Sequence, residues 1–149
     1  MKKRSKSRTW AVQAAYTMHL SGEAGEDILE DFFRWRKIGE QNRELTEQLV
    51  LALENHLEEV DGAISGYLKN WSPERLARLD RIILRLGVAE LLYLKDIPPS
   101  VTINEYVELA RLFGTDESHR FVNAVLDSIR KDHMTDIAGS PPSGTEDNT

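Results

Sequence analysis

Five basic side chains gather within the first eight residues of the chain. Residues 1–8, the basic arm, contain no acidic residue, and their cations are Lys2, Lys3, Arg4, Lys6 and Arg8. Lysine and arginine neutralise phosphates and release counterions, and arginine also stacks on exposed bases and forms forked hydrogen bonds with them. The alternative interpretation is a solubilising, disordered N-terminus. The arm therefore indicates nucleic-acid binding without establishing it.

The reactive side chains elsewhere do not form the pattern of an enzyme. The sequence has no phosphate loop, nucleophile elbow or dinucleotide fingerprint, and its four histidines include no H-E-x-x-H pair. Asp80 and Glu90 share an expected helix, but ten residues separate them, so solvated helix charges explain them more simply than a catalytic pair. The chain has no cysteine, which excludes disulfides and thiolate metal sites. We expect no enzyme activity, no metal and no cofactor.

The charge of the chain is unevenly distributed. Of the net charge of −6, the arm contributes +5 and the last fifteen residues −3, which leaves −8 on the residues between them. A basic arm on an acidic body argues against indiscriminate binding of polyanions, because most of the surface repels phosphate. Any contact with nucleic acid should therefore be local.

Helical periodicity runs through most of the sequence, and no segment reads as a strand. The first four expected helices cover residues 9–20, 27–37, 44–69 and 78–94. The third is the longest, because an apolar stripe from Leu45 to Tyr67 repeats at helical spacing. After the third helix, Ser72 and Pro73 are expected to open the following helical segment, with serine as its N-cap and proline as its first residue. No run is long and apolar enough for a membrane span, so we expect a cytoplasmic protein.

The segment 101–127 predicts two further short helices joined by a tight turn. Thr102 and Glu105 form a T-x-x-E pattern, which is typical of a capping box at the start of a helix. Gly114 stands where a helix would end in a left-handed residue. Valines and an isoleucine then recur at helical spacing from Val122 to Ile129. A helical hairpin is the expected structure.

Several stretches of the sequence, in their order along the chain, resemble the NusB family of bacterial transcription antitermination factors. They are WAVQAAY at 10–16, RLARLDRIILRLGVAELL at 75–92, INEYVELARLFG at 103–114 and SHRFVNAVLD at 118–127. The resemblance covers residues 4–131 and weakens over residues 23–41.

Periodicity and resemblance lead to the same expected architecture. The fold is all-α, with two packed three-helix subdomains, a flexible basic N-terminal arm and a disordered C-terminal tail. The expected units are the arm (1–8), an N-terminal helical half (9–70), a C-terminal helical half (71–134) and the tail (135–149).

The resemblance implies an RNA-binding antitermination factor. In the family, an arginine-rich arm contacts boxA, a short single-stranded element of nascent ribosomal RNA, and Arg4, Lys6 and Arg8 occupy the matching positions. Further residues match family positions near the RNA, and they are Phe113, Glu117, Arg120 and Phe121. The two phenylalanines could stack on bases, but the sequence alone favours a core position for one or both of them. Glu117 could accept a hydrogen bond from a base or serve only as a first-turn acid.

The resemblance also implies protein partners. NusB-like proteins pair with NusE, a small-subunit ribosomal protein, and the heterodimer links boxA to elongating RNA polymerase and suppresses premature termination. Tyr16, Glu74 and Asp80 match positions of the NusE surface, although ordinary solvated surface and a half-buried tyrosine remain alternatives. Some relatives also form homodimers.

Two other functions fit the same sequence. The first is a stand-alone relative of the RNA-binding domain that precedes certain ribosomal RNA cytosine methyltransferases. The second is a helical adaptor that binds only proteins, which would leave the arm unexplained.

Overall fold

The structure, a computed structural model, describes residues 3–67 and 76–134, and over these residues it is all-α, as expected. The helices are α1 (Lys3–Ser21), α2 (Gly25–Trp35), α3 (Glu40–Asn55), α4 (Leu57–Ser65), α5 (Arg78–Tyr93), α6 (Pro99–Phe113), α7 (Ser118–Ile129) and a terminal π-helical turn, η2 (Arg130–Met134). None of these helices combines the length and apolar character that a membrane span requires. The expected cap at Ser72 and Pro73, the division near residue 70 and the tail over 135–149 lie outside the described residues.

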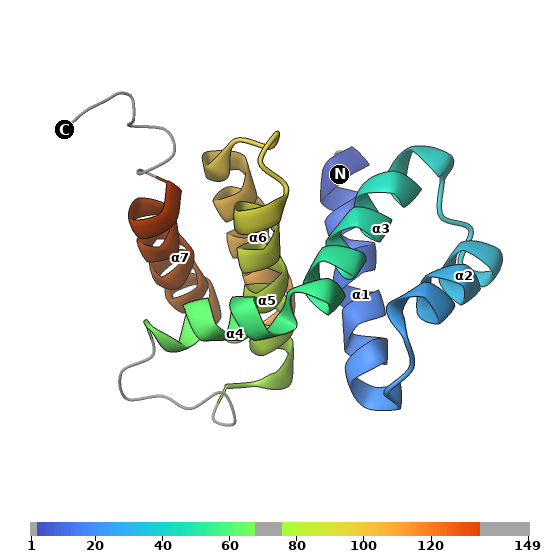
Figure 1. The fold of residues 1–149 in the computed structure, drawn as a ribbon, viewed down its shortest axis with the longest axis horizontal. Helices are drawn as coiled ribbons and strands as arrows, with labels where there is room; N and C mark the ends of the chain where they lie inside the picture. Colours follow the sequence, from blue (N-terminus) through green and yellow to red (C-terminus); the bar gives the residue numbers. More distant parts are fainter. Residues whose placement is uncertain (1–2, 68–75, 135–149) are drawn as a thin grey trace.

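Two groups of helices pack side by side around α5 (Figure 1). In the first half, α1 packs most extensively against α3, and in the second α6 packs most extensively against α7. Helix α5 contacts α1 and α3 on one side and α4, α6 and α7 on the other. Because neighbours cover it on so many sides, α5 is buried over most of its length, from Asp80 to Leu91.

The long helix expected over residues 44–69 is broken in two. Helix α3 ends at Asn55 and α4 begins at Leu57, because the backbone of His56 leaves the helical region, with φ −126° and ψ 27°. The apolar stripe that predicted one helix is buried on both pieces, so periodicity alone did not reveal the change of direction. The His56 ring stacks on Tyr93 of α5, with 3.8 Å between ring centroids. The break gives the second half a fourth helix that crosses α5.

The first helix starts earlier than expected, at Lys3, so the described part of the arm belongs to α1. The arm has no apolar periodicity, which is why the sequence predicted a start at Thr9. Polar contacts hold it in place instead: Ser7 is buried and donates a hydrogen bond to Asn42 of α3 over 3.0 Å. Thr46 of α3 donates another to the Ser7 carbonyl oxygen, also over 3.0 Å.

The capping box expected at Thr102 and Glu105 is wrong. Helix α6 begins at Pro99, with Pro98 as its N-cap residue, so both residues lie inside the helix. Proline suits this first position because it has no N–H to satisfy and its φ is already helical. Thr102 and Glu105 are free to point at other helices, and each does so at the site described below.

Gly114 ends α6 in an extended conformation, with φ −103° and ψ −167°, and not in the expected left-handed one. Close packing explains the glycine. An alanine Cβ at this position would lie 2.5 Å from Oγ of Ser118 and 2.7 Å from the carbonyl oxygen of Ala110. The turn from α6 into α7 is therefore too tight for any side chain here.

Candidate nucleic-acid interface

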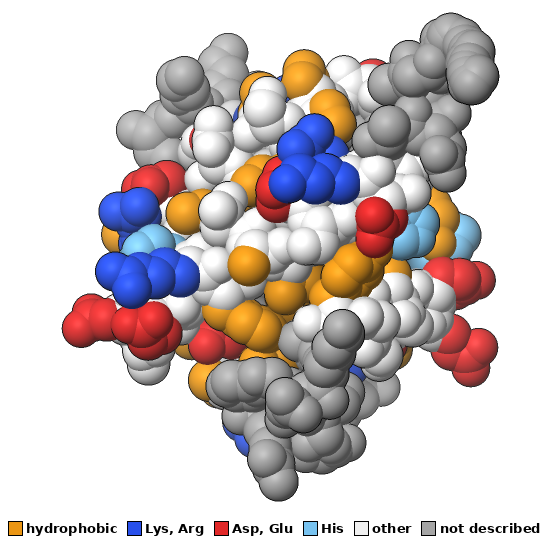
Figure 2. Space-filling view, turned by 90° about the vertical axis from the view of Figure 1, so that its left-hand side faces the viewer, with side chains coloured by type: hydrophobic (Ala, Val, Ile, Leu, Met, Phe, Trp, Pro, Cys, Tyr) orange, Lys and Arg blue, Asp and Glu red, His pale blue; other side chains and the backbone are white. Residues whose placement is uncertain are grey.

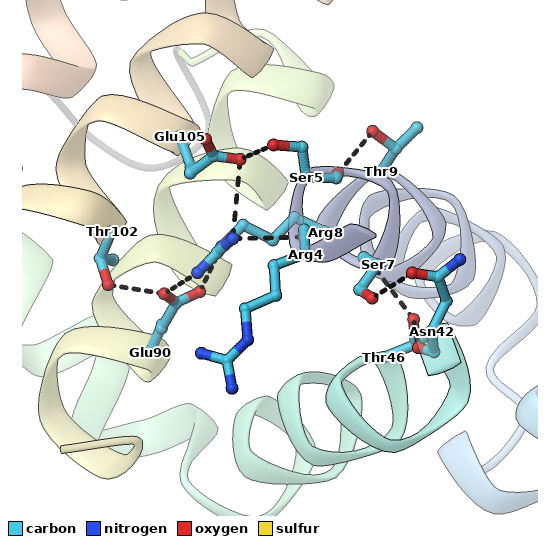
Figure 3. A network of polar contacts seen from close by, with 10 residues as sticks. All are labelled: Arg4, Ser5, Ser7, Arg8, Thr9, Asn42, Thr46, Glu90, Thr102 and Glu105. Carbon is cyan, nitrogen blue, oxygen red and sulfur yellow. Dashed lines mark hydrogen bonds and ion pairs between the residues drawn. The ribbon is translucent and has the colours of Figure 1, made fainter. Parts of the chain in front are cut away.

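The arm presents two described cations to solvent. Arg4 and Lys6 are both exposed, and neither forms an ion pair with any residue that the structure describes. In Figure 3 the Arg4 side chain extends away from α1 with no drawn partner for its guanidinium. Lys2 and the side chain of Lys3 lie outside the described part of the chain. Arg4 and Lys6 are thus available for phosphate.

Arg8, one turn after Arg4 on α1, is buried in the protein. Arg8 is only 1% exposed, and its guanidinium forms two parallel hydrogen bonds with the Glu90 carboxylate of α5. Nε donates to Oε1 over 2.9 Å and Nη2 to Oε2 over 2.7 Å (Figure 3). The expectation that Arg8 meets RNA phosphates is therefore not met in this structure, because a buried carboxylate already occupies its donors.

A wider network surrounds this pair. Thr102 of α6 donates a hydrogen bond to Glu90, and Ser5 of α1 donates one to Glu105 of α6. Nη1 of Arg8 donates to the carbonyl oxygen of Arg4 over 3.2 Å and lies 3.6 Å from the Glu105 carboxylate. The start of α1 is thereby tied to both α5 and α6 (Figure 3).

The pKa values of Arg8 and of the neighbouring Tyr106 are shifted at this network. Burial by itself lowers the pKa of Arg8, but the hydrogen bonds and charge of Glu90 outweigh it and raise that pKa above its ordinary value. Burial, with the charge of Glu90, raises the pKa of Tyr106 well above its usual range. The Tyr106 hydroxyl has no hydrogen-bond partner in the described part of the chain. Arg8 is consequently a guanidinium cation hydrogen-bonded to Glu90, next to a neutral Tyr106 phenol.

A second polar network fixes the turn between α6 and α7. Ser118 is 3% exposed and donates a hydrogen bond to Oδ2 of Asp80 over 2.9 Å. The Thr115 backbone N–H donates to Oγ of Ser118 over 2.8 Å. The other Asp80 oxygen, Oδ1, is buried without a partner among the described residues. Asp80 thus anchors the turn from beneath.

An open hollow of about 590 Å³ lies beside this turn. Its lining mixes apolar and polar side chains, which are Leu76, Ala77, Asp80, Thr115, Glu117, Ser118, Arg120 and Phe121. Figure 2 shows the face of the molecule that carries α7, where exposed hydrophobic side chains lie among separate basic and acidic ones. This composition suits a ligand with both a flat apolar face and polar edges.

The four residues expected near RNA differ in exposure. Phe113 is 41% exposed at the end of α6, so it is not a core residue, whereas Phe121 is half-buried and packs against the core. Arg120 and Glu117 are exposed, and their ion pair of 3.9 Å holds neither firmly. Phe121, Arg120 and Glu117 meet at the hollow, while Phe113 lies outside its lining.

The residues expected at the partner surface are not brought together. Asp80 is buried and holds the turn, so its carboxylate is not presented to a partner. Tyr16 is half-buried and packs against the core from α1. Glu74 lies outside the described residues.

Asp80 and Glu90 also correct the expectation of solvated helix charges, because they are 9% and 0% exposed. A signal for Glu90 was present in the sequence: it stands alone among apolar residues, in the run Leu86–Leu92. A charged residue in such a run must be paired if the run is buried. Its partners, Arg8 and Thr102, are remote in sequence and could not be named from spacing.

Helix α6 connects the two networks. Glu105, in the middle of α6, lies beside the arm, and Phe113 is the last residue of the helix, eight residues further on, or about 12 Å along the axis. The exposed cations of α1 and the hollow at the turn are therefore separate features of one molecule, held at a fixed spacing.

Comparison with known proteins identifies the family of this chain. Residues 5–131 match the sequence model of the NusB family. The chain belongs to the NusB family. It is 43% identical over 130 residues to the transcription antitermination protein NusB of Methylacidiphilum infernorum, covering 87% of this chain and 91% of that protein. The family membership expected from the sequence motifs is confirmed.

Solved NusB structures share the fold. T. maritima NusB superposes with a TM-score of 0.80 at 37% identity, covering 87% of this chain and 92% of that one. A crystal structure of the antitermination factors NusB and NusE in complex with double-stranded RNA gives a TM-score of 0.80 at 30% identity. That match covers 89% of this chain and 99% of the other. A NusB relative with this fold therefore assembles with both NusE and RNA.

NusB proteins are regulatory factors. Among the residues that the structure describes, no group of three or more histidines, aspartates or glutamates is placed to hold a metal ion. The two buried carboxylates, Asp80 and Glu90, are used for anchoring helices.

Proposed function

We propose that this protein is an RNA-binding transcription antitermination factor that binds boxA of nascent ribosomal RNA together with NusE and suppresses premature termination. The observation that supports this most is the pair of exposed cations, Arg4 and Lys6, which no carboxylate of the described residues neutralises, on the helix that leads into the rest of a NusB fold. Nascent ribosomal RNA is made in the cytoplasm, where this protein would act.

The two surface features would play different parts in RNA binding. Arg4 and Lys6, with Lys2 and Lys3 preceding them, would neutralise phosphates. The hollow at the α6–α7 turn would take a base, with Phe121 stacking on its face and Arg120 or Glu117 meeting its polar edge. Phe113 would offer a second stacking surface nearby. Such contacts need unstacked bases, which favours single-stranded boxA over a duplex.

Protein partnership extends the proposal. NusE is present in the related complex with RNA, and Tyr16 and Glu74 are the residues proposed to face it here. Asp80 would support that surface only from beneath, because it is buried. The bound NusE and RNA would bring this protein into contact with elongating RNA polymerase. Before NusE and RNA bind, the protein would be a homodimer.

A gel-shift titration with a single-stranded boxA oligonucleotide, with and without NusE, tests the proposal. If the four cations from Lys2 to Lys6 meet phosphates, the log–log salt slope should be about −2.8. Replacing Arg4 and Lys6 with glutamine should halve that slope to about −1.4.

A matched control removes the same charge elsewhere. Arg34 and Lys95 are exposed cations on other parts of the molecule, and replacing both with glutamine should leave the slope near its original value. Duplex RNA of the same sequence serves as the competitor. Failure of the intact protein to shift the oligonucleotide, with NusE and without it, would overturn the proposed function. NusE binding without any RNA binding would favour the adaptor function instead.

A further inference from the structure

We infer that Glu90 is a positioning residue for RNA binding, which contacts no RNA but holds the basic first turns of α1 in the conformation that presents Arg4 and Lys6. This inference rests on the proposed function. It concerns a residue that is fully buried, at 0% exposure, and remote from solvent and from the hollow.

The start of α1 needs such support. Its first turn contains no acidic residue and several basic ones, although the partial positive charge at a helix N-terminus favours acids there. The two-turn segment also buries little apolar surface, since only Ser7 and Arg8 of its described side chains are buried. Helix ends of this kind fray unless tertiary contacts hold them.

Glu90 supplies the strongest of these contacts. Its two oxygens accept both fork hydrogen bonds of Arg8, and Thr102 adds a third donor. The same guanidinium then donates to the carbonyl oxygen of Arg4, one turn nearer the N-terminus. A continuous chain of hydrogen bonds therefore runs from the last turn of α5 to the backbone of an exposed cation.

Removing the charge of Glu90 should loosen this segment without altering any proposed RNA contact. Glu90→Gln leaves Arg8 a buried cation without its carboxylate, and Arg8 then gains by turning out to water, which unwinds the turns around it. RNA would have to order residues 3–8 again on binding, so affinity should fall tenfold or more.

Asp61→Asn is the matched control. Asp61 also forms a forked pair with an arginine on α5, Arg85, with both contacts at 2.9 Å. That pair joins α4 to α5 and takes no part in the network around Arg8. The control should therefore change RNA affinity less than twofold, even where it lowers the melting temperature.

The experiment measures boxA affinity, NusE affinity and amide hydrogen exchange for each variant. Glu90→Gln is expected to weaken RNA binding tenfold or more, to keep NusE binding, and to speed exchange over residues 3–8 while the core stays protected. If Glu90→Gln does not fold, Thr102→Val replaces it. That change removes one donor and keeps the ion pair, so a two- to fivefold loss of RNA affinity is expected.

A combined variant separates positioning from general stability. When Arg4 and Lys6 are already glutamine, adding Glu90→Gln should weaken RNA binding less than twofold, because the two cations that Glu90 is inferred to present are already gone. An undiminished tenfold loss in that background, or wild-type affinity in folded Glu90→Gln, would overturn the inference. Absence of RNA binding by the unmodified protein would refute the proposed function instead, whereas unchanged exchange over residues 3–8 would refute only the positioning role.

Discussion

Replacing Gly114 with alanine should destabilise the protein through a single steric conflict. The new Cβ would lie 2.5 Å from Oγ and 2.6 Å from Cβ of Ser118, and 2.7 Å from the carbonyl oxygen of Ala110. Two of these neighbours belong to a buried side chain and the third to helix backbone, so none can yield cheaply. The turn between α6 and α7 would have to open.

The size of the effect follows from what the opened turn loses. Overpacking of this kind costs about 1–3 kcal/mol. Displacing Ser118 also removes the one hydrogen bond that the buried Asp80 carboxylate accepts from the described residues. A buried acceptor left without a partner costs a further 1–3 kcal/mol or so. About 3 kcal/mol is the central expectation, which corresponds to a drop in melting temperature of roughly 6–12 °C for a chain of this length.

Urea denaturation followed by circular dichroism measures the change, with Gly62→Ala as the control. Gly62 lies in α4 with open space around its Cβ position, so alanine there should stabilise the protein by about 0.5–1 kcal/mol. Equal stability of Gly114→Ala and wild type would refute the steric explanation. A loss of similar size in both variants would do so too, because it would show a general intolerance of alanine.

Three further predictions follow from other contacts. Burial, together with the charges of three arginines on α5, lowers the pKa of His19, so its NMR titration midpoint should lie below 6.5. Below about pH 6.5 the unfolded state then binds more protons than the folded state, so the free energy of unfolding should fall as the pH drops. His19→Gln should weaken this pH dependence of stability. Phe113→Ala should reduce boxA affinity with little change in melting temperature, whereas Phe121→Ala should reduce both, because only Phe121 packs against the core; equal melting temperatures would contradict this difference. Gly87→Ala should lower the free energy of unfolding by about 1–3 kcal/mol, because its Cβ would lie 3.0 Å from the fully buried Leu126 side chain. Urea denaturation measures this change, and an unchanged midpoint would show that Leu126 can move.

The sequence predicted the helices more reliably than their ends. Periodicity located α2, α5 and α7 within a few residues, because each has an apolar face that packs on the core. It missed the break at His56, since the apolar stripe continues across it in both pieces. It also missed the first two turns of α1, where polar contacts with α3, α5 and α6 take the place of an apolar face.

The candidate site was predictable in its surface part and hidden in its buried part. Exposed cations such as Arg4 and Lys6 can be proposed from charge clustering, because their role needs only solvent access. Arg8 has the same residue type and a neighbouring position, yet it is buried by a partner 82 residues away. No local pattern distinguishes the two situations. Arg4 lies one turn before Arg8 on the same face of α1. The distinction therefore depends on how far along α1 its contact with α5 and α6 reaches, and that is a property of tertiary packing.

The two buried carboxylates of α5 suggest why this protein tolerates charges in its core. Asp80 holds the α6–α7 turn and Glu90 holds the start of α1, and ten residues of one helix, about 15 Å, separate them. A buried ion pair seldom stabilises a fold more than apolar side chains of the same volume would. Apolar contacts, however, are non-directional and would let α1 slide or rotate, whereas a forked pair accepts one orientation. Two surface features are proposed to bind RNA, and Glu90 and Asp80 attach both of them to one rigid helix, α5. The distance between the phosphate contacts and the base contacts is therefore set before RNA binds.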